Sequence, residues 1–205
     1  MTKRLLCMCC WCFCLLTAAS AQIGTGKPAY ALFDNEGKGI TYEQLVRQLA
    51  KYDVVFLGEM HNCPITHWLE FEITRSLYGI HKEKLTLGEE MMESDNQLIL
   101  DEYLQRKITY ERFEEEARLW PNYSTDYYPV VFFAKENKIP FVATNIPRRY
   151  ANAVKNGGME ALDSLSDEAK RYIAPLPIAF DYDEKESEAA FSMMNMMGGR
   201  KSGDN

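Results

Sequence analysis

The stretch that decides the fold is DVVFLGEMHN, residues 53–62. Its first half, residues 53–57, is a short and almost continuous apolar run, which is typical of a parallel β-strand buried on both faces. Its second half turns polar at once and places Glu59 and His61 directly after the apolar run. The stretch therefore predicts a buried strand with chemically active side chains at its carboxyl end.

Two further strands are predicted at residues 85–88 and 140–144, where apolar runs end in polar residues. Helices are predicted between and around them, from apolar periodicity, capping residues and prolines at first helical turns. Their expected ranges are 41–51, 64–78, 95–105, 109–119, 129–138 and 147–157, with a last short helix capped by Ser166. This order predicts an α/β fold with a mostly parallel central sheet, flanking helices and a helical insertion.

Ligands of open α/β sheets bind beyond the carboxyl ends of the strands. Glu59 and His61 follow the first predicted strand, Glu89 and Glu90 follow the second, and Thr144-Asn145 ends the third. We therefore expect these side chains to meet at one rim of the sheet.

A divalent metal is one expectation for this rim. Glu59, His61 and Glu90 offer an imidazole and two carboxylates, which suit zinc, iron or manganese. A metal-bound water would then allow hydrolysis. The alternative is structural: Glu59 caps the following helix, His61 makes a hydrogen bond, and His67 is a satisfied helical histidine.

A planar, anionic ligand is the second expectation. The loop Trp120–Pro129 carries one tryptophan and three tyrosines, whose flat rings suit such a ligand, and a tyrosinate can bind ferric haem iron axially. Arg148 and Arg149 open a predicted helix and can pair with a carboxylate or a haem propionate. Ordinary loop packing and solvated surface charges are the alternatives.

Composition and the N-terminal residues bear on location. A formal net charge of -7 argues against a nucleic-acid binder. Residues 1–21 join a basic start, an apolar run and Ala19-Ser20-Ala21, which predicts a secretory signal cleaved before Gln22. A retained anchor is the alternative, and lipidation of a leader cysteine is a weaker one. The predicted mature chain, residues 22–205, is a single domain that keeps only Cys63, so it has no intramolecular disulfide.

The motifs together resemble the ChaN family of haem-binding uptake lipoproteins, from about residue 30 to residue 177. The resemblance is carried by four groups of residues: 55–62 with His67, 87–104, Trp120-Pro121 with Tyr128-Pro129, and 140–148. It implies an exported haem binder at the periplasmic side or the outer membrane, with an uptake receptor as partner and often a homodimer. For a haem binder, we expect Tyr128 on the iron, with His61 and His67 as alternatives or pocket donors. Trp120 is the candidate for the contact with the ring, and Arg148 and Arg149 are the propionate candidates.

The same resemblance carries an alternative function. It places the chain near the Tiki and erythromycin-esterase-like superfamily, in which Gly58, His61 and Glu90 match a metal-dependent hydrolytic pattern. The chain also departs from the family at its end, because residues 180–205 replace a further helix and a late strand. We therefore expect that the C-terminal part of the family domain is missing, together with any ligand that it supplies.

Overall fold

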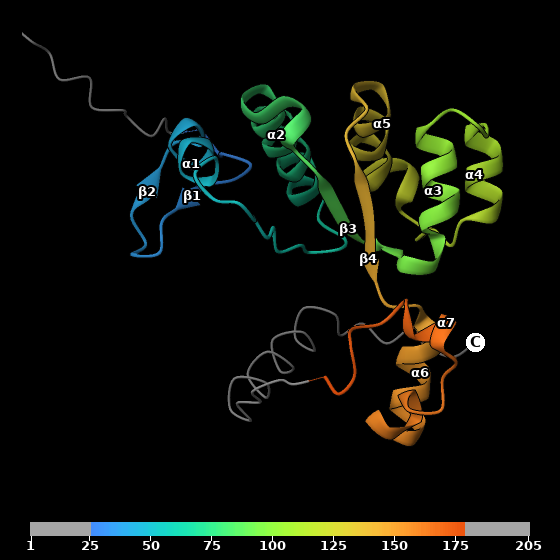
Figure 1. Ribbon diagram of the computed structural model, residues 1–205. Helices are drawn as coiled ribbons and strands as arrows, with labels where there is room; N and C mark the ends of the chain where they lie inside the picture. The colour runs from blue at the N-terminus through green and yellow to red at the C-terminus, as the bar shows by residue number, and fades with distance from the viewer. Residues whose placement is uncertain (1–25, 179–205) are drawn as a thin grey trace, which may run out of the picture. The chain divides into compact units, whose positions relative to one another are not determined.

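The computed structural model describes residues 26–178 (Figure 1). The predicted signal, residues 1–21, and the departing C-terminal segment, residues 180–205, lie outside the described residues. The chain divides into two compact units, Met1–Thr41 and Tyr42–Asn205.

The described part of the smaller unit is a short antiparallel hairpin, formed by β1 (Leu32–Phe33) and β2 (Gly39–Ile40). Asp34 organises the turn, because its Oδ1 accepts the backbone N–H groups of Glu36 and Lys38 at 3.0 and 2.8 Å. Gly37 has a φ of 79°, a left-handed conformation that glycine adopts without steric cost.

The described part of the larger unit is rich in helices. Its strands are β3 (Leu87–Glu93) and β4 (Phe141–Asn145). Its helices are α1 (Tyr42–Leu49), α2 (Pro64–His81), α3 (Gln97–Leu104), α4 (Tyr110–Glu116), α5 (Tyr128–Asn137), α6 (Arg148–Gly157) and α7 (Asp167–Lys170). Short 3-10 turns cover Lys82–Lys84, Ser94–Asn96 and Met159–Leu162, and a π-helical turn covers Tyr123–Tyr127.

The helices follow their sequence signals closely. Thr109 caps α4 by accepting the Arg112 N–H at 3.4 Å, and Ser166 caps α7 by accepting the Ala169 N–H at 3.2 Å. Pro64 occupies the first turn of α2, where its missing N–H costs no hydrogen bond. None of the helices in the described residues has the length and apolar character needed to cross a membrane.

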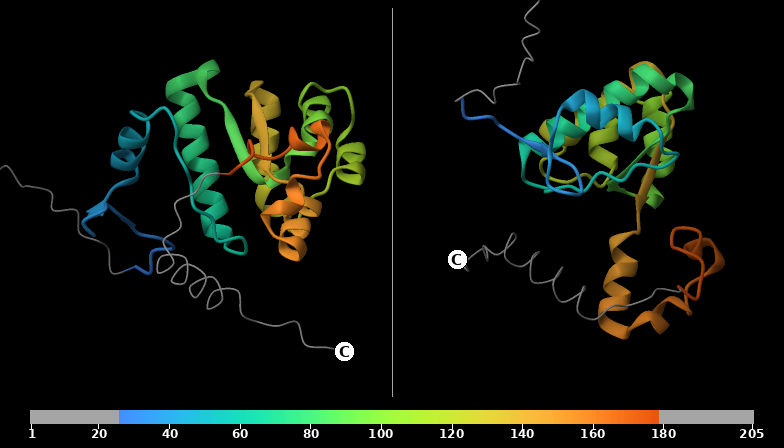
Figure 2. Two further views of the ribbon diagram at one scale, coloured as in Figure 1. Left: turned by 60° about the horizontal axis from the view of Figure 1, so that its bottom comes forward. Right: turned by 90° about the vertical axis from the view of Figure 1, so that its left-hand side faces the viewer.

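Strands β3 and β4 form a parallel pair and lie side by side in Figure 1 and in the left view of Figure 2. Leu87 pairs with Phe141 and Glu89 with Ala143, and the register becomes irregular between Glu89 and Glu93. Gly88 is needed at this pair, since a Cβ there would lie 2.9 Å from Thr144 Cγ2. The α/β class is thus confirmed, while the described residues form no parallel sheet larger than this pair.

The predicted strand at residues 53–57 is wrong. These residues pair with neither β3 nor β4, and Phe56 is 94% exposed. An apolar run becomes a strand only where a neighbour's edge accepts its backbone hydrogen bonds, and the run itself carries no information about that neighbour.

The end predicted for the second strand is also wrong. The strand does not stop at Gly88 but continues to Glu93, so Glu89 and Glu90 lie within it. Because side chains alternate across a strand, Glu89 shares a face with Leu87 and Met91, while Glu90 is exposed on the other face.

The hydrophobic core lies between the β3–β4 pair and helices α3, α4 and α5. Tyr103 and Phe113 stack there, with ring centroids 4.7 Å apart and an interplanar angle of 13°. The side chains of Leu100, Phe113 and Val131 are completely buried. This packing holds the π-helical turn Tyr123–Tyr127 and the carboxyl end of β3 in place beside the loop that carries Glu59 and His61.

Candidate functional site

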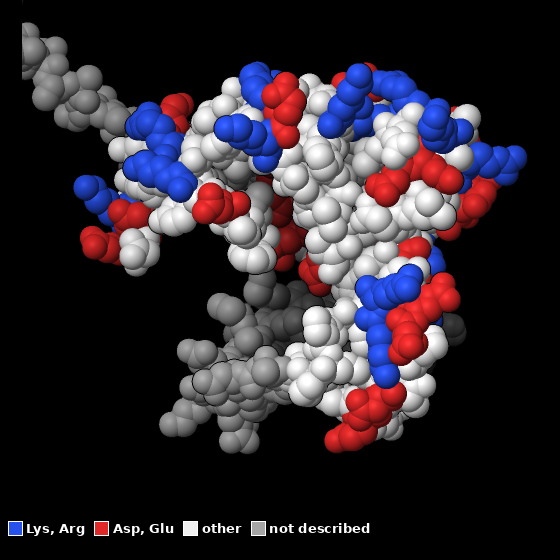
Figure 3. All heavy atoms as spheres, viewed as in Figure 1, with Lys and Arg blue, Asp and Glu red and all other residues white. Residues whose placement is uncertain are grey.

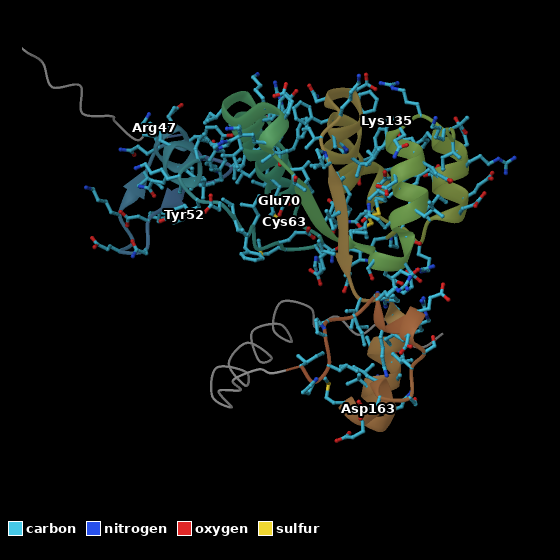
Figure 4. The ribbon with its side chains drawn as sticks, in the orientation of Figure 1. Arg47, Tyr52, Cys63, Glu70, Lys135 and Asp163 are labelled. Atoms are coloured by element: carbon cyan, nitrogen blue, oxygen red, sulfur yellow. The ribbon has the colours of Figure 1, made fainter. Side chains whose placement is uncertain are left out.

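The loop before α2 and the first turns of α2 bring several titratable side chains together. Glu59 and His61 lie in the loop, and His67 and Glu70 lie three residues apart on one face of the helix. Figure 4 shows Glu70 on the N-terminal half of α2 beside β3. We call the following residues the acid–histidine cluster: Glu59, His61, His67, Glu70, Glu89 and Asp126.

Glu59 is the hub of this cluster. Its Oε1 lies 2.6 Å from His61 Nδ1 and accepts a hydrogen bond of 2.6 Å from the Tyr127 hydroxyl. His67 Nε2 lies 3.9 Å from the same oxygen. Tyr127 is almost completely buried, and its ring meets the His67 ring edge-on at 4.8 Å. Burial and the bond to Glu59 raise the pKa of Tyr127, which keeps its hydroxyl protonated as a donor.

His67 is buried, with 4% of its surface exposed. Its Nε2 lies 3.1 Å from the backbone carbonyl oxygen of His61 and 3.7 Å from Asp126 Oδ2. Its Nδ1 lies 3.5 Å from Glu70 Oε2 but makes no hydrogen bond. Asn122 supports this arrangement by donating to Asp126 Oδ2 at 2.8 Å and to the His61 carbonyl at 2.9 Å.

Two carboxyl groups of the cluster, those of Glu70 and Glu89, have a raised pKa. Burial, and then the charge of Glu59, raise the pKa of Glu70 to about 7. Burial, and then Glu59 and Glu70, raise the pKa of Glu89 well above its ordinary value. Acidic atoms are visible in a recess beside β3 in the space-filling view (Figure 3). The cluster therefore concentrates negative charge in a partly buried place.

The structure groups a different set of ligand atoms from the one that the sequence predicts. Glu59, His67 and Glu70 each offer one ligand atom within 4.8 Å of the other two. His61 stays at the edge of this group, bonded to Glu59 with half of its side chain exposed. Glu90 points to the opposite face of β3, so the predicted trio Glu59, His61 and Glu90 is not brought together.

A second feature lies next to the cluster. An open hollow of 480 Å³, which we call the arginine hollow, is lined by Glu93, Arg118, Leu119, Trp120, Pro121, Arg148 and Arg149. The volume falls within the usual range for small-molecule sites. It brings the predicted Trp120, Arg148 and Arg149 together, from two segments far apart in the sequence.

The charges of the arginine hollow are partly balanced. Asp95 accepts hydrogen bonds from both Arg118 and Arg149, and Glu93 accepts one from Arg118 at 3.0 Å. The bond from Arg149 to Asp95 also raises the pKa of that guanidinium. Arg148 is exposed and has no ion pair within residues 26–178. Three cations thus face two carboxylates, which leaves one positive charge for an anion.

Trp120 joins the two features. Its ring meets the His61 ring edge-on, with centroids 4.8 Å apart and an interplanar angle of 80°. It also meets the Tyr127 ring at 5.7 Å. The exposed imidazole of His61 therefore stands at the border between the acid–histidine cluster and the arginine hollow.

Tyr128 lies in a different environment from Tyr127. Its ring packs against Tyr110 at 4.9 Å, Phe132 at 5.6 Å and Tyr123 at 6.1 Å, all on the α3–α5 side. Trp120 and His67 each make a ring contact with Tyr127 and none with Tyr128 among the described residues. Tyr127 therefore belongs with the acid–histidine cluster, whereas Tyr128 packs among the aromatic rings of α4 and α5.

The sequence argument did not select Glu70, Tyr127 or Arg118. Glu70 carried a usable signal, because it lies three residues after His67 and so on the same helical face. Tyr127 and Arg118 carried none, since their roles depend on the orientation of the π-helical turn and on a distant partner, Asp95.

The fold and the arginine hollow define an α/β protein with a surface site suited to a small anionic ligand. The chain belongs to a family described as haem-binding uptake, Tiki superfamily, ChaN, because the model of that family matches residues 45–205. Among solved structures it is similar to one titled "Cofacial heme binding to ChaN of Campylobacter jejuni", with 19% identity and a TM-score of 0.60. The match covers 82% of this chain and 63% of that one, and a search of curated proteins found no match. The family resemblance and the α/β class predicted from the sequence are thereby confirmed.

Proposed function

We propose that this protein binds haem and serves haem or iron uptake. Family membership supports the proposal, and the observation that carries it is the arginine hollow. Haem combines a flat apolar ring with two carboxylates, and the hollow combines the Trp120-Pro121 surface with three guanidinium groups. These residues therefore fit the two halves of the ligand.

The guanidinium groups have different roles in this proposal. Asp95 holds Arg118 and Arg149 in place at the hollow. With Arg148, the three arginines exceed the two carboxylates Glu93 and Asp95 by one positive charge. Arg148 is the exposed group without an ion pair among the described residues, so it is the propionate ligand that we favour. A bond between a guanidinium group and a carboxylate is strong and well oriented.

His61 is the iron ligand that the geometry supports best. The Glu59 carboxylate can only accept a hydrogen bond, so His61 Nδ1 carries the hydrogen and Nε2 keeps its lone pair. A carboxylate behind a metal-bound imidazole fixes its tautomer and orientation. His61 is also half exposed and touches Trp120 of the hollow. Tyr128, the ligand that the sequence favours, and His67 are the alternatives.

Haemin titration of purified variants tests these roles. Arg148→Gln should weaken haemin binding by about 10-fold or more, since a charge-assisted bond is worth about 1.5–3 kcal/mol. The matched control is Arg112→Gln, an exposed arginine of α4 that pairs with Glu115. His61→Ala should change the Soret band, whereas His81→Ala and Tyr128→Phe should not. Equal effects of Arg148→Gln and Arg112→Gln would contradict the propionate assignment.

A metal-dependent hydrolase is the second candidate, favoured by the acid–histidine cluster beside an open hollow. It requires a bound metal without porphyrin and turnover that depends on that metal. Turnover of ester or peptide substrates by metal-loaded protein, lost in His61→Ala, would support this candidate over haem uptake.

The uptake role carries three further proposals from the sequence. They are export to the periplasm or the outer membrane, a haem-uptake receptor as partner, and a homodimer. Light scattering with and without haemin measures the last of these directly.

A further inference from the structure

The hydrogen bond of His67 determines which of its ring nitrogens is free. Nε2 contacts the carbonyl oxygen of His61 at 3.1 Å, and a carbonyl oxygen only accepts. Nε2 therefore carries the hydrogen, and in the neutral ring Nδ1 keeps a lone pair. This Nδ1 is buried and has no hydrogen-bond partner.

Glu70 lies opposite this nitrogen. Its Oε2 is 3.5 Å from His67 Nδ1, and the two atoms are separated by a buried gap without a hydrogen bond. Glu70 Oε1 and Glu89 Oε2 are also buried without a hydrogen-bond partner. A buried acceptor without a donor is destabilising, so a cation between these oxygens and His67 Nδ1 would stabilise the site.

No side chain in the described part of the structure supplies that positive charge. The ion-pair contacts of Glu59, Glu70 and Asp126 there are made with histidines and not with lysine or arginine. Arg118 and Arg149 of the arginine hollow are bound to Asp95 and Glu93 instead. Glu59, Glu70 and Asp126 thus surround the His67 imidazole without a lysine or arginine among their described ion-pair partners.

We propose that His67, Glu70 and Glu59 bind a divalent transition-metal ion. One imidazole nitrogen and two carboxylates suit zinc, manganese or iron(II). Each of the three residues offers a ligand atom within 4.8 Å of the others. Two ligand atoms of a tetrahedral metal lie roughly 3.4 Å apart when each metal–ligand distance is about 2.1 Å. Small rotations of the side chains would bring the three ligand atoms to that separation.

The surroundings of these ligands are those of a metal centre. The second ring nitrogen of His67 donates to a backbone carbonyl, which is the usual support of a metal-bound histidine. Glu59 is held by Tyr127 and His61, whose contacts both fall on Oε1. This site differs from the proposed haem site, and from the trio that the sequence predicts, in using both helical residues of α2.

Titration of the metal-free protein with Co²⁺ and Zn²⁺, without haemin, tests the proposal. We expect one Co²⁺ per chain with visible d–d absorption, displaced by Zn²⁺. Glu70→Gln should weaken binding at least tenfold, and His67→Gln likewise. The control Glu72→Gln, on the same helix but paired with Arg75 at the surface, should bind as the wild type does.

Thermal unfolding adds a measurement that does not depend on the His67 variant, which loses a buried side chain. Zn²⁺ should raise the Tm of the wild type and of Glu72→Gln, but not that of Glu70→Gln. Folded wild-type protein that binds neither metal, or a Glu70→Gln variant that binds as the wild type does, would overturn the proposal. In that case a proton on Glu70 fills the gap, and infrared absorption of a protonated carboxyl would show it. Haemin is absent throughout, so the result is independent of the haem proposal.

Discussion

Replacing Tyr127 by phenylalanine tests whether the acid–histidine cluster is assembled as described. The Tyr127 hydroxyl donates to Glu59 Oε1 at 2.6 Å, and the tyrosine is 1% exposed. The substitution removes one oxygen and keeps the ring contacts with His67 and Trp120, so it opens no sizeable cavity. What is lost is a short hydrogen bond to a carboxylate, which is worth about 1.5–3 kcal/mol.

Urea unfolding measures this loss. For a urea dependence of about 2 kcal/mol per molar, the midpoint of Tyr127→Phe should fall by about 1 M. The control is Tyr110→Phe, which removes a hydroxyl that bonds to Glu114 at 3.1 Å on the exposed side of α4. We expect the control to cost about 0.5 kcal/mol or less, as is usual for surface changes. Equal losses in the two variants would refute the bond to Glu59, and with it the assembled cluster.

Two more predictions concern the cluster and the core. In metal-free protein, the pKa of Glu70 rises from 4.5 when unfolded to about 7 when folded. The folded state therefore holds this proton more tightly, and its advantage is complete below pH 4.5 and lost as the pH rises to about 7. The unfolding free energy of the wild type should therefore fall relative to that of Glu70→Gln as the pH rises through that window; a constant difference would contradict the assignment. Phe113→Ala removes a completely buried ring that stacks on Tyr103, so it should cost about 3–5 kcal/mol, and a loss below about 1 kcal/mol would show that the core is placed wrongly.

Local signals in the sequence were sufficient for the helices and for the parallel pair. Thr109, Ser166 and Pro64 act over one helical turn, so their effect is readable without knowing the rest of the fold. The strand at residues 53–57 failed because pairing needs a partner, and both described strands of the larger unit pair with each other instead.

The candidate site was predictable where neighbours in sequence decide it. Glu59, His61 and His67 were found, because the loop and the first turn of α2 hold them close together. The sequence did not show which of Glu89 and Glu90, or which of Tyr127 and Tyr128, faces the acid–histidine cluster. Each choice depends on which way one residue faces, and strand register and the π-helical turn set that direction.

The arginine hollow could be anticipated only in part. Trp120, Arg148 and Arg149 were selected for their chemistry, but their meeting depends on Asp95, which joins Arg118 and Arg149. Such contacts join residues more than 20 positions apart, so no pattern along the chain reveals them.

Haemin titration of the purified protein, followed by its Soret absorbance, tests the central claim most directly. The account predicts a saturable, shifted band near one haem per chain, weakened about 10-fold or more in Arg148→Gln but not in Arg112→Gln. Protein shown to be folded that gives no specific band would contradict haem binding at this site.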